Sequence, residues 1–349
     1  MVISSTDINL KNIILIILDV SSLYMMNKIK KIKKVPVFVL MWLLSHTKFY
    51  QTKKKRAFFK IFFKFIQKFK REKANYSFDQ NDYPWLNNLF EDGFMLSQFN
   101  LKNKFGIIDA LGPIHNEVVS EANDLISGAF PLQHSHYSKD YLRQLDLSKI
   151  PTKKLKLFYQ YFTHPVFLNT AAAYLKDKPL LTELKILISP PINKINFEGS
   201  QVFHSDFDDE RNLKIFIFLD DVLINSGPLE AINLVDSSRL MAGWGYKWGK
   251  KNISHNDNIA KSLPKEKITS FLGPQGSVCL IDSVSCLHRG SRNPIRSRKI
   301  LYATYNTRTS FRFPPLNWIG LLPKINSISS PLSKLDPSLS FINENALNL

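Results

Sequence analysis

The stretch Gly199-Ser-Gln-Val-Phe-His-Ser-Asp-Phe-Asp-Asp209 places His204 and Asp206 two residues apart in a run that is typical of a strand. Alternate residues of a strand point to the same face, so this pattern predicts that one rigid element projects an imidazole and a carboxylate together. His288, at the end of another strand-like run, is the candidate for a third metal ligand. These three side chains are therefore our candidate metal site.

Strand-like runs surround both candidate ligand segments. Residues 213–219 form a continuous β-prone run, which the turn residues at 225–229 close. A glycine-punctuated turn and a short apolar strand at 273–282 precede His288, and residues 298–305 form a further strand after it. We therefore predict a mainly β fold with flanking helices, whose core is a double-stranded β-helix (jelly roll, cupin-like). We expect the segment 84–185 to be mainly helical, with short helices at 155–162 and 167–175, and residues 237–267 to form a polar insertion in the strand-rich half.

The types of the three candidate ligands indicate which kind of metal site they could form. Two histidines and one carboxylate that leave coordination positions open are typical of the facial triad of non-haem Fe(II) oxygenases, whereas a structural zinc site closes its shell with four ligands. A lone His-x-Asp pair also occurs often at a solvated strand end. The prediction therefore depends on the third ligand, His288, and on the strands around it.

The same residues resemble a known family, the phytanoyl-CoA dioxygenase-type Fe(II)/2-oxoglutarate oxygenases. The resemblance covers residues 83–315, and the two ligand segments are its specific part. The matching positions are Gln201, Phe203, His204, Asp206, Asp208, Asp209, Gly227, Pro228, Asp282, His288, Gly290, Ser291 and Arg292.

The resemblance implies a role for each site residue. His204, Asp206 and His288 would be the iron ligands, and Arg298 would bind the distal carboxylate of the co-substrate 2-oxoglutarate in a fork geometry that a lysine cannot reproduce. Lys299 is the alternative, because the family usually places this arginine about eleven residues after the second histidine, and here Arg298 is ten and Lys299 eleven residues after His288. The implied reaction is hydroxylation of a small or lipid-like organic substrate. Related halogenases replace the carboxylate by a small residue, so Asp206 favours hydroxylation.

Two functions from other classes compete with this hypothesis. The first is a non-catalytic jelly-roll binding module, against which the complete set of ligands and Arg298 argues. The second is a cupin-type metal-dependent hydrolase or isomerase, which would not require Arg298.

Nearby polar residues are expected to have structural roles. For Gln201 we expect a structural hydrogen bond, and for residues 208–209 a turn cap or an ion pair with Arg211 or Lys214. Asp282 has two interpretations: it supports a ligand histidine, or it is an ordinary strand-end aspartate.

The charge divides the chain into three predicted parts. Residues 1–75 hold 17 lysine and arginine residues against 3 acidic ones, while the whole chain has a net charge of +18. We predict a basic amphipathic helical leader at 1–75, the oxygenase domain at 76–315 and a C-terminal tail at 316–349.

The leader favours a membrane surface. Lys60, Lys64 and Lys68 recur at a helical period of four, and phenylalanines fill most of the positions between them, as in a helix that lies in a membrane interface. The apolar runs at 13–18 and 35–44 are shorter than the roughly 20 residues that span a bilayer. Packing against the oxygenase domain or a second subunit is an alternative.

A third interpretation is that the leader is not a native segment, because Met25, Met26 and Met41 are alternative starts. Nucleic acid is not an expected partner, since the basic charge lies on a strongly apolar helix. The two cysteines, Cys279 and Cys286, are poorly placed for a disulfide and indicate a reducing compartment. We expect a cytoplasmic protein that associates through the leader with the inner face of the membrane.

Overall fold

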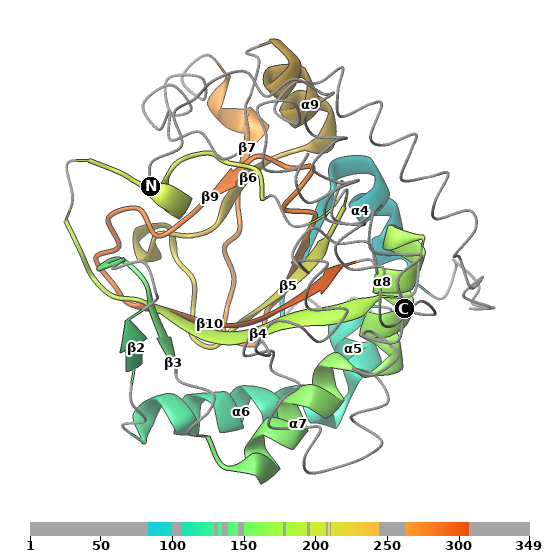
Figure 1. Cartoon of the computed structure of the whole chain (residues 1–349), viewed down its shortest axis with the longest axis vertical. Coiled ribbons are helices and arrows are strands. Elements are labelled where there is room, and N and C mark those ends of the chain that lie inside the picture. The colour runs from blue at the N-terminus through green and yellow to red at the C-terminus, as the bar shows by residue number, and fades with distance from the viewer. Residues whose placement is uncertain are drawn as a thin grey trace, which may run out of the picture.

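Antiparallel strands dominate the fold (Figure 1). The computed structural model describes residues 83–99, 106–128, 132–134, 139–145, 150–176, 179–193, 196–206, 209, 211–243 and 263–306. Within these residues the larger sheet has seven strands in the order β1-β8-β5-β10-β4-β3-β2, and the smaller has three in the order β7-β6-β9. The strands are β1 Phe94–Ser97, β2 Leu132–His134, β3 Arg143–Leu145, β4 Leu180–Ser189, β5 Leu213–Phe218, β6 Glu230–Ile232, β7 Ile268–Ser270, β8 Val278–Ile281, β9 His288–Arg289 and β10 Arg298–Asn306.

The order in which the chain visits the sheets defines a jelly roll. Strands β4, β5, β8 and β10 belong to the larger sheet, while β6, β7 and β9 belong to the smaller one. Between β4 and β5, His204 forms an antiparallel bridge with His288 of β9, so this segment also reaches the smaller sheet. The chain thus winds between two facing sheets, and the predicted double-stranded β-helix is confirmed.

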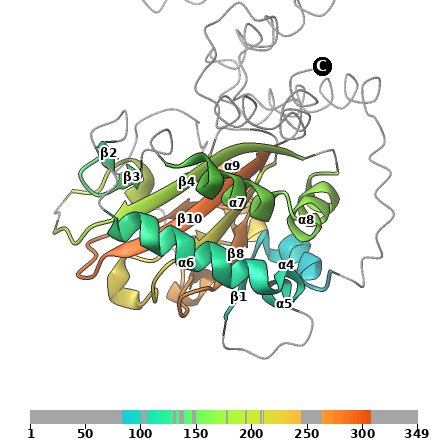
Figure 2. The same ribbon diagram turned by 90° about the horizontal axis from the view of Figure 1, so that it is seen from below.

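Helices cover the outer face of the larger sheet (Figure 2). They are α4 Trp85–Asp92, α5 Ile107–Leu111, α6 Pro113–Ser127, α7 Thr152–Phe162 and α8 Pro165–Leu175. Prolines stand in the first turn of α6 and α8, where their missing N–H costs no hydrogen bond. One continuous apolar core joins these helices to the sheet.

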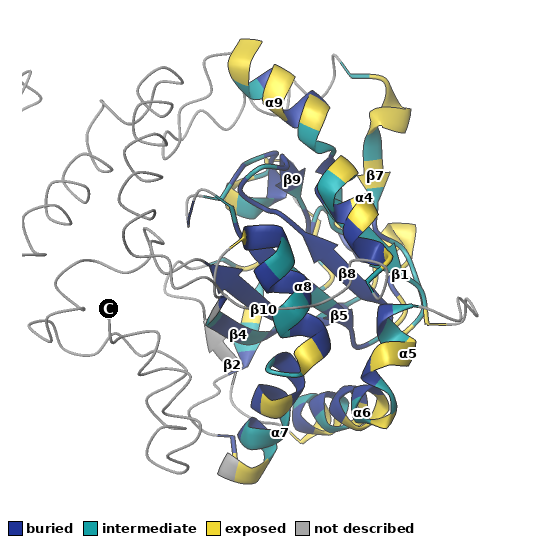
Figure 3. Cartoon of the chain, turned by 90° about the vertical axis from the view of Figure 1, so that its right-hand side faces the viewer, coloured by how far each residue is buried: buried dark blue, intermediate teal, exposed yellow. Residues whose placement is uncertain are grey.

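Strand β10 shows how the two faces of the larger sheet differ. Leu301, Ala303 and Tyr305 belong to the core beneath the helices, while Ile300 belongs to a separate cluster inside the jelly roll. Because side chains alternate along a strand, Arg298 and Tyr302 share the inner face with Ile300. Strands β8 and β10, at the centre of the fold, are buried on both faces (Figure 3).

The predicted helices and strands are partly confirmed. The expected helices at 155–162 and 167–175 correspond to α7 and α8. The expectation of a mainly helical segment at 84–185 missed β1, β2 and β3, because runs of three or four residues are too short to show a period.

Several predictions fall on residues outside the described ranges. These are the leader at 1–75, the tail at 316–349 and most of the polar insertion that follows α9 Leu234–Gly243. The short 3₁₀ helices of the described chain are η4 Gly199–Gln201, η5 Ile224–Ser226 and η6 Lys265–Lys267. No helix within the described residues is long and apolar enough to cross a bilayer.

Candidate metal centre

The three predicted ligands converge inside the jelly roll. Ligand atoms of His204, Asp206 and His288 all lie within 4.8 Å of one another. Nε2 of His204 is 3.7 Å from Oδ1 of Asp206, and Nε2 of His288 is 3.7 Å from Oδ2. A cluster this tight, of two imidazoles and one carboxylate, has the donor set that a divalent transition metal prefers.

Backbone pairing brings the two ligand segments together. The backbone N–H groups of His204 and His288 each donate to the other residue's carbonyl oxygen, at 3.0 and 2.9 Å. Asp206 N–H donates to the carbonyl of Ser283 at 2.9 Å. Residues far apart in the sequence are therefore fixed side by side.

The predicted strand across 199–209 is wrong. The stretch opens with η4, and of its described residues, 199–206 and 209, only His204 makes a bridge. Gly199 has φ +54°, and a Cβ there would lie 2.6 Å from Tyr141 Oη, so the chain turns at a position that only glycine fits. The ligands converge because of the bridge to β9 and the contact with Ser283, and a continuous strand is not needed.

Hydrogen bonds orient both imidazoles. Nδ1 of His204 lies 2.9 Å from the carbonyl of Val202, and Nδ1 of His288 lies 3.1 Å from the carbonyl of Cys286. A carbonyl only accepts, so each Nδ1 carries the proton and each Nε2 has its lone pair free for a metal.

The protonation states of the three candidate ligands suit the binding of a cation. Burial lowers the pKa of His288 to about 3, and it also lowers the pKa of His204, so both rings are neutral at physiological pH. Burial alone would raise the pKa of Asp206, but the Lys214 ammonium holds it below its usual range. Asp206 is therefore ionised.

Asp206 has two donors that the sequence did not reveal. Lys214 Nζ lies 2.5 Å from Oδ2, and Ser283 Oγ donates to the same oxygen at 2.6 Å. β5 thus directs Lys214 to Asp206, and the expected turn cap or ion pair of residues 208–209 stays a prediction. Among those two residues, Asp209 is buried, and Asp208 lies outside the described residues.

Asp282 does not contact a ligand histidine. Its Oδ2 accepts a hydrogen bond from Tyr174 Oη at 2.8 Å, and its Oδ1 accepts from the backbone of Val284 and Ser285 at 3.1 and 3.0 Å. The first interpretation is therefore wrong, since the carboxylate points toward α8 and its own turn. Burial raises the pKa of this side chain.

Gln201 has the structural role that we predicted. Its Nε2 donates to the carbonyl of Ser291 at 2.7 Å, and its Oε1 accepts from the backbone of Glu198 at 3.4 Å. The side chain is fully buried and ties η4 to the loop after β9.

Arg298 is a buried cation on the inner face of β10. Its side chain is 6% exposed, and Nη2 donates to Ser291 Oγ at 2.9 Å and to Ser189 Oγ at 3.4 Å. Within the described residues, its Nε has no hydrogen-bond partner and its guanidinium has no carboxylate within ion-pairing distance. Burial lowers the pKa of Arg298 to about 10, so the charge persists at neutral pH.

The neighbouring cation lies on the other face of the strand. Lys299 shares its face with Leu301 and Ala303, which contact the helices. Gly290 leaves room beside Arg298, because a Cβ there would approach Nη2 to 3.4 Å. The alternation of β10 thus favours Arg298 over Lys299 as the residue that faces the interior.

The polar interior extends beyond the ligands. Lys185 and Lys214 each place Nζ 5.9 Å from the centre of the Tyr302 ring. Tyr302 Oη donates to Glu183 at 3.1 Å, and Lys185 Nζ lies 2.6 Å from the same carboxylate. One feature of the sequence could have indicated this polar interior: a charged residue inside an apolar strand, as Lys214 is in β5.

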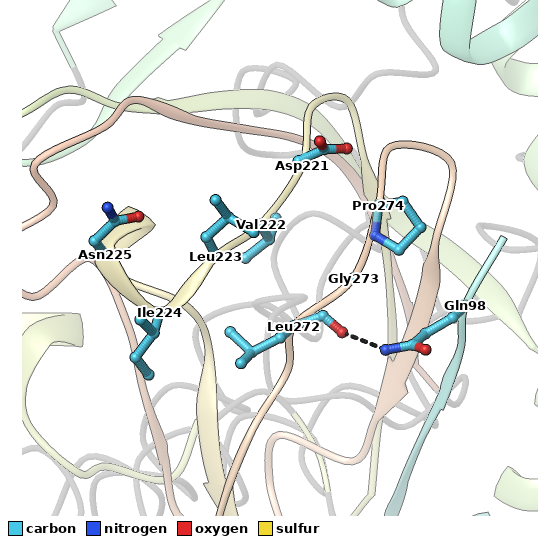
Figure 4. A pocket seen from close by; sticks show the side chains of 9 residues that line it. All are labelled: Gln98, Asp221, Val222, Leu223, Ile224, Asn225, Leu272, Gly273 and Pro274. Atoms are coloured by element: carbon cyan, nitrogen blue, oxygen red, sulfur yellow. Dashed lines mark hydrogen bonds between the residues drawn. The ribbon is translucent and has the colours of Figure 1, made fainter. Parts of the chain in front are cut away.

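A separate surface pocket of about 560 Å³ contains none of the candidate ligands. Val222, Leu223, Ile224 and Leu272 form much of its lining, and Gln98 donates a hydrogen bond to the Leu272 carbonyl at its rim (Figure 4). Leu223 and Ile224 are exposed.

Comparison with known proteins gives only remote likenesses. No protein-family model and no curated protein matches the chain significantly. Among solved structures, the α-ketoglutarate-dependent epimerase SnoN from nogalamycin biosynthesis has 14% identity and a TM-score of 0.46, over 71% of this chain and 92% of that one. EctD from S. alaskensis has 15% identity and a TM-score of 0.43, over 68% and 81%. AviO1 from Streptomyces viridochromogenes has 17% and 0.37, over 63% and 92%.

Proposed function

We propose that this protein is an Fe(II)- and 2-oxoglutarate-dependent dioxygenase that hydroxylates a small or lipid-like organic substrate. His204, Asp206 and His288 would hold the iron on one face. The single observation that carries the proposal is the combination of this triad with a buried guanidinium, Arg298, which has no carboxylate within ion-pairing distance among the described residues.

The ligand residues fit ferrous iron. Both histidines present a neutral Nε2, and Asp206 supplies one negative charge, which leaves a site with three protein ligands and open positions. When bound, the iron with 2-oxoglutarate and dioxygen supplies the oxidation of a C–H bond. The protein's own part is to hold the ligands and to keep the imidazoles neutral, with Nε2 free for the metal.

Arg298 fits the far carboxylate of the co-substrate. A buried cation without a counter-ion is costly, and a carboxylate ligand would remove that cost. The guanidinium already donates to Ser291 and Ser189, so those hydroxyls fix its plane while Nε remains available. The fork geometry of arginine is suited to binding a carboxylate through two parallel hydrogen bonds.

An anaerobic titration with Fe(II) and 2-oxoglutarate tests the assignment through the visible charge-transfer band of the chelate. We expect a band in the wild type and none in Asp206→Ala or Arg298→Ala. Lys299→Ala is the matched control, because it removes the adjacent cation from the opposite face of β10, and it should retain the band. An iron-loaded wild type without a band would contradict the use of 2-oxoglutarate and would favour a binding module. Turnover and metal binding that survive Arg298→Ala would favour a cupin-type hydrolase or isomerase.

The proposal includes peripheral membrane contact through residues 1–75, which lie outside the described structure. The support is the alternation of Lys60, Lys64 and Lys68 with phenylalanines. Flotation with anionic liposomes compares the full-length wild type with the triple variant K60E/K64E/K68E. We expect the wild type to float and the variant to remain in solution. Equal partition of both proteins would contradict the membrane assignment.

A further inference from the structure

The two carboxylate oxygens of Asp206 have different surroundings. Oδ2 accepts from Ser283 Oγ at 2.6 Å and from Lys214 Nζ at 2.5 Å. Oδ1 lies 3.7 Å from His204 Nε2 and accepts no hydrogen bond from the residues that the structure describes. Each carboxylate oxygen has about two lone pairs for acceptance, so Oδ2 is filled while Oδ1 is open.

The hydroxyl of Ser283 is oriented by a second side chain. Asn212 Nδ2 donates to Ser283 Oγ at 2.9 Å, and the backbone N–H of Ser283 donates to Asn212 Oδ1 at 2.9 Å. Because the hydroxyl oxygen already accepts from Asn212, its proton is directed to the closer acceptor, which is Asp206. Ser283 thus donates in a fixed direction.

Hydrogen bonds to Asp282 and to the Ser283 carbonyl fix the turn that carries Ser283. Asp282 is fully buried, and its two oxygens accept from Tyr174 and from the backbone of Val284 and Ser285. The carbonyl of Ser283 in turn accepts from the backbone of Asp206. The position of Ser283 is therefore set by the scaffold in the absence of any ligand.

We propose that Ser283 is a positioning residue that, together with Lys214, occupies Oδ2 of Asp206 and so presents Oδ1 alone to a bound divalent metal. The inference rests on the proposed metal site. A carboxylate that binds through one oxygen leaves open a coordination position that a two-oxygen mode would take. Hydrogen bonds of this kind to a ligand carboxylate commonly change metal affinity 10–100-fold.

Co(II) binding to the full-length protein tests the inference without turnover, through calorimetry for affinity and the visible absorption spectrum for coordination number. We expect Ser283→Ala to bind Co(II) about 10–100-fold more weakly and to show a spectrum of higher coordination number. Ser283→Thr, which retains the hydroxyl, should restore both. Lys214→Met keeps the alkyl stem and frees Oδ2 of its other donor, so it should show the same spectrum of higher coordination number; affinity is not its readout, because the variant also removes a cation that repels the metal. It also serves as the second variant should Ser283→Ala fail to fold.

Ser205→Ala is the matched control. Ser205 Oγ donates to the carbonyl of Val284 in the same turn and to the backbone carbonyl of Asp206 at 3.3 Å. Within the described residues no hydrogen bond joins it to the carboxylate of Asp206, so its removal should leave Co(II) affinity and spectrum unchanged. Wild-type affinity and spectrum in Ser283→Ala would overturn this inference alone. Equal weakening in Ser205→Ala would overturn it too, because the integrity of the turn would then explain the loss. A wild type that binds no Co(II) would overturn the proposed function together with this inference.

Discussion

The two faces of the larger sheet have opposite character, although the same strands build both. Toward the helices, β4, β5 and β10 present aliphatic and aromatic side chains that are almost wholly buried. Toward the interior the same strands present Lys185, Lys214, Tyr302 and Arg298, in addition to a smaller apolar cluster. The apolar side chains on the helix-backed face supply most of the burial that stabilises the domain. This stabilisation offsets the free-energy cost of placing polar groups on the inner face.

The helix-backed face should be where a truncation costs most. Phe162 of α7 is fully buried between Tyr161 and Phe167, with ring centres 5.1 and 5.8 Å away. We expect Phe162→Ala to lower the free energy of unfolding by about 3–5 kcal/mol in urea titrations. Phe216→Ala on the half-buried inner face should cost less than about 2 kcal/mol. An equal loss for both variants would erase the contrast between the faces.

Acid should destabilise the metal-free protein, because His288 in the jelly-roll interior binds a proton more weakly in the folded than in the unfolded chain. The pKa of His288 is about 3 when folded and lies near 6.5 when unfolded, so between these values the unfolded chain binds a proton that the folded one does not. Stability is therefore fully present above pH 6.5 and falls as the pH drops toward 3. We expect a loss on the order of a few kcal/mol. Chemical unfolding at several pH values measures it, and a slope unchanged in His288→Gln would assign the loss elsewhere.

Metal should stabilise the fold only through the inner face. At a Mn(II) concentration 100 times Kd, linkage adds about 2.7 kcal/mol to the free energy of unfolding. Thermal unfolding should show this gain in the wild type and none in Asp206→Ala. Phe162→Ala should retain the gain from a lower starting Tm, because its ligands are intact. A loss of the metal-dependent gain in Tm in both Asp206→Ala and Phe162→Ala would contradict the assignment of metal binding to the inner face alone.

Arg298 should contribute little to stability. Its guanidinium is buried without a carboxylate among the described residues, and the two hydroxyls that it binds also bind each other at 2.8 Å. We therefore expect Arg298→Met to change the free energy of unfolding of the ligand-free protein by less than about 1 kcal/mol. Its 2-oxoglutarate-dependent gain in Tm should be absent. A large loss of stability without ligand would show a structural role.

Sequence patterns predicted the fold and assembled the candidate site, but not the contacts that complete it. The β-prone runs that correspond to β5, β8 and β10 indicated a jelly roll, and sequence motifs indicated His204, Asp206, His288 and Arg298 as site residues. Short strands such as β1 carried no signal, because four residues hardly show a period.

The strand assigned to 199–209 was wrong for a related reason. Valine and phenylalanine gave the stretch a strand-like composition, but Gly199 turns the chain and η4 follows. The two ligands nevertheless lie together, since the bridge between His204 and His288 and the contact of Asp206 with Ser283 replace the missing strand.

The sequence alone determined the residue types that could meet a metal, because side-chain chemistry can be read from the residues themselves. It left Arg298 and Lys299 as alternatives, and the tertiary structure showed which face of β10 each occupies. Only the tertiary structure decided which donors orient Asp206. Ser283 and Lys214 lie 77 and 8 residues away along the chain, and a hydrogen bond depends on the fold that brings its partners within 3 Å.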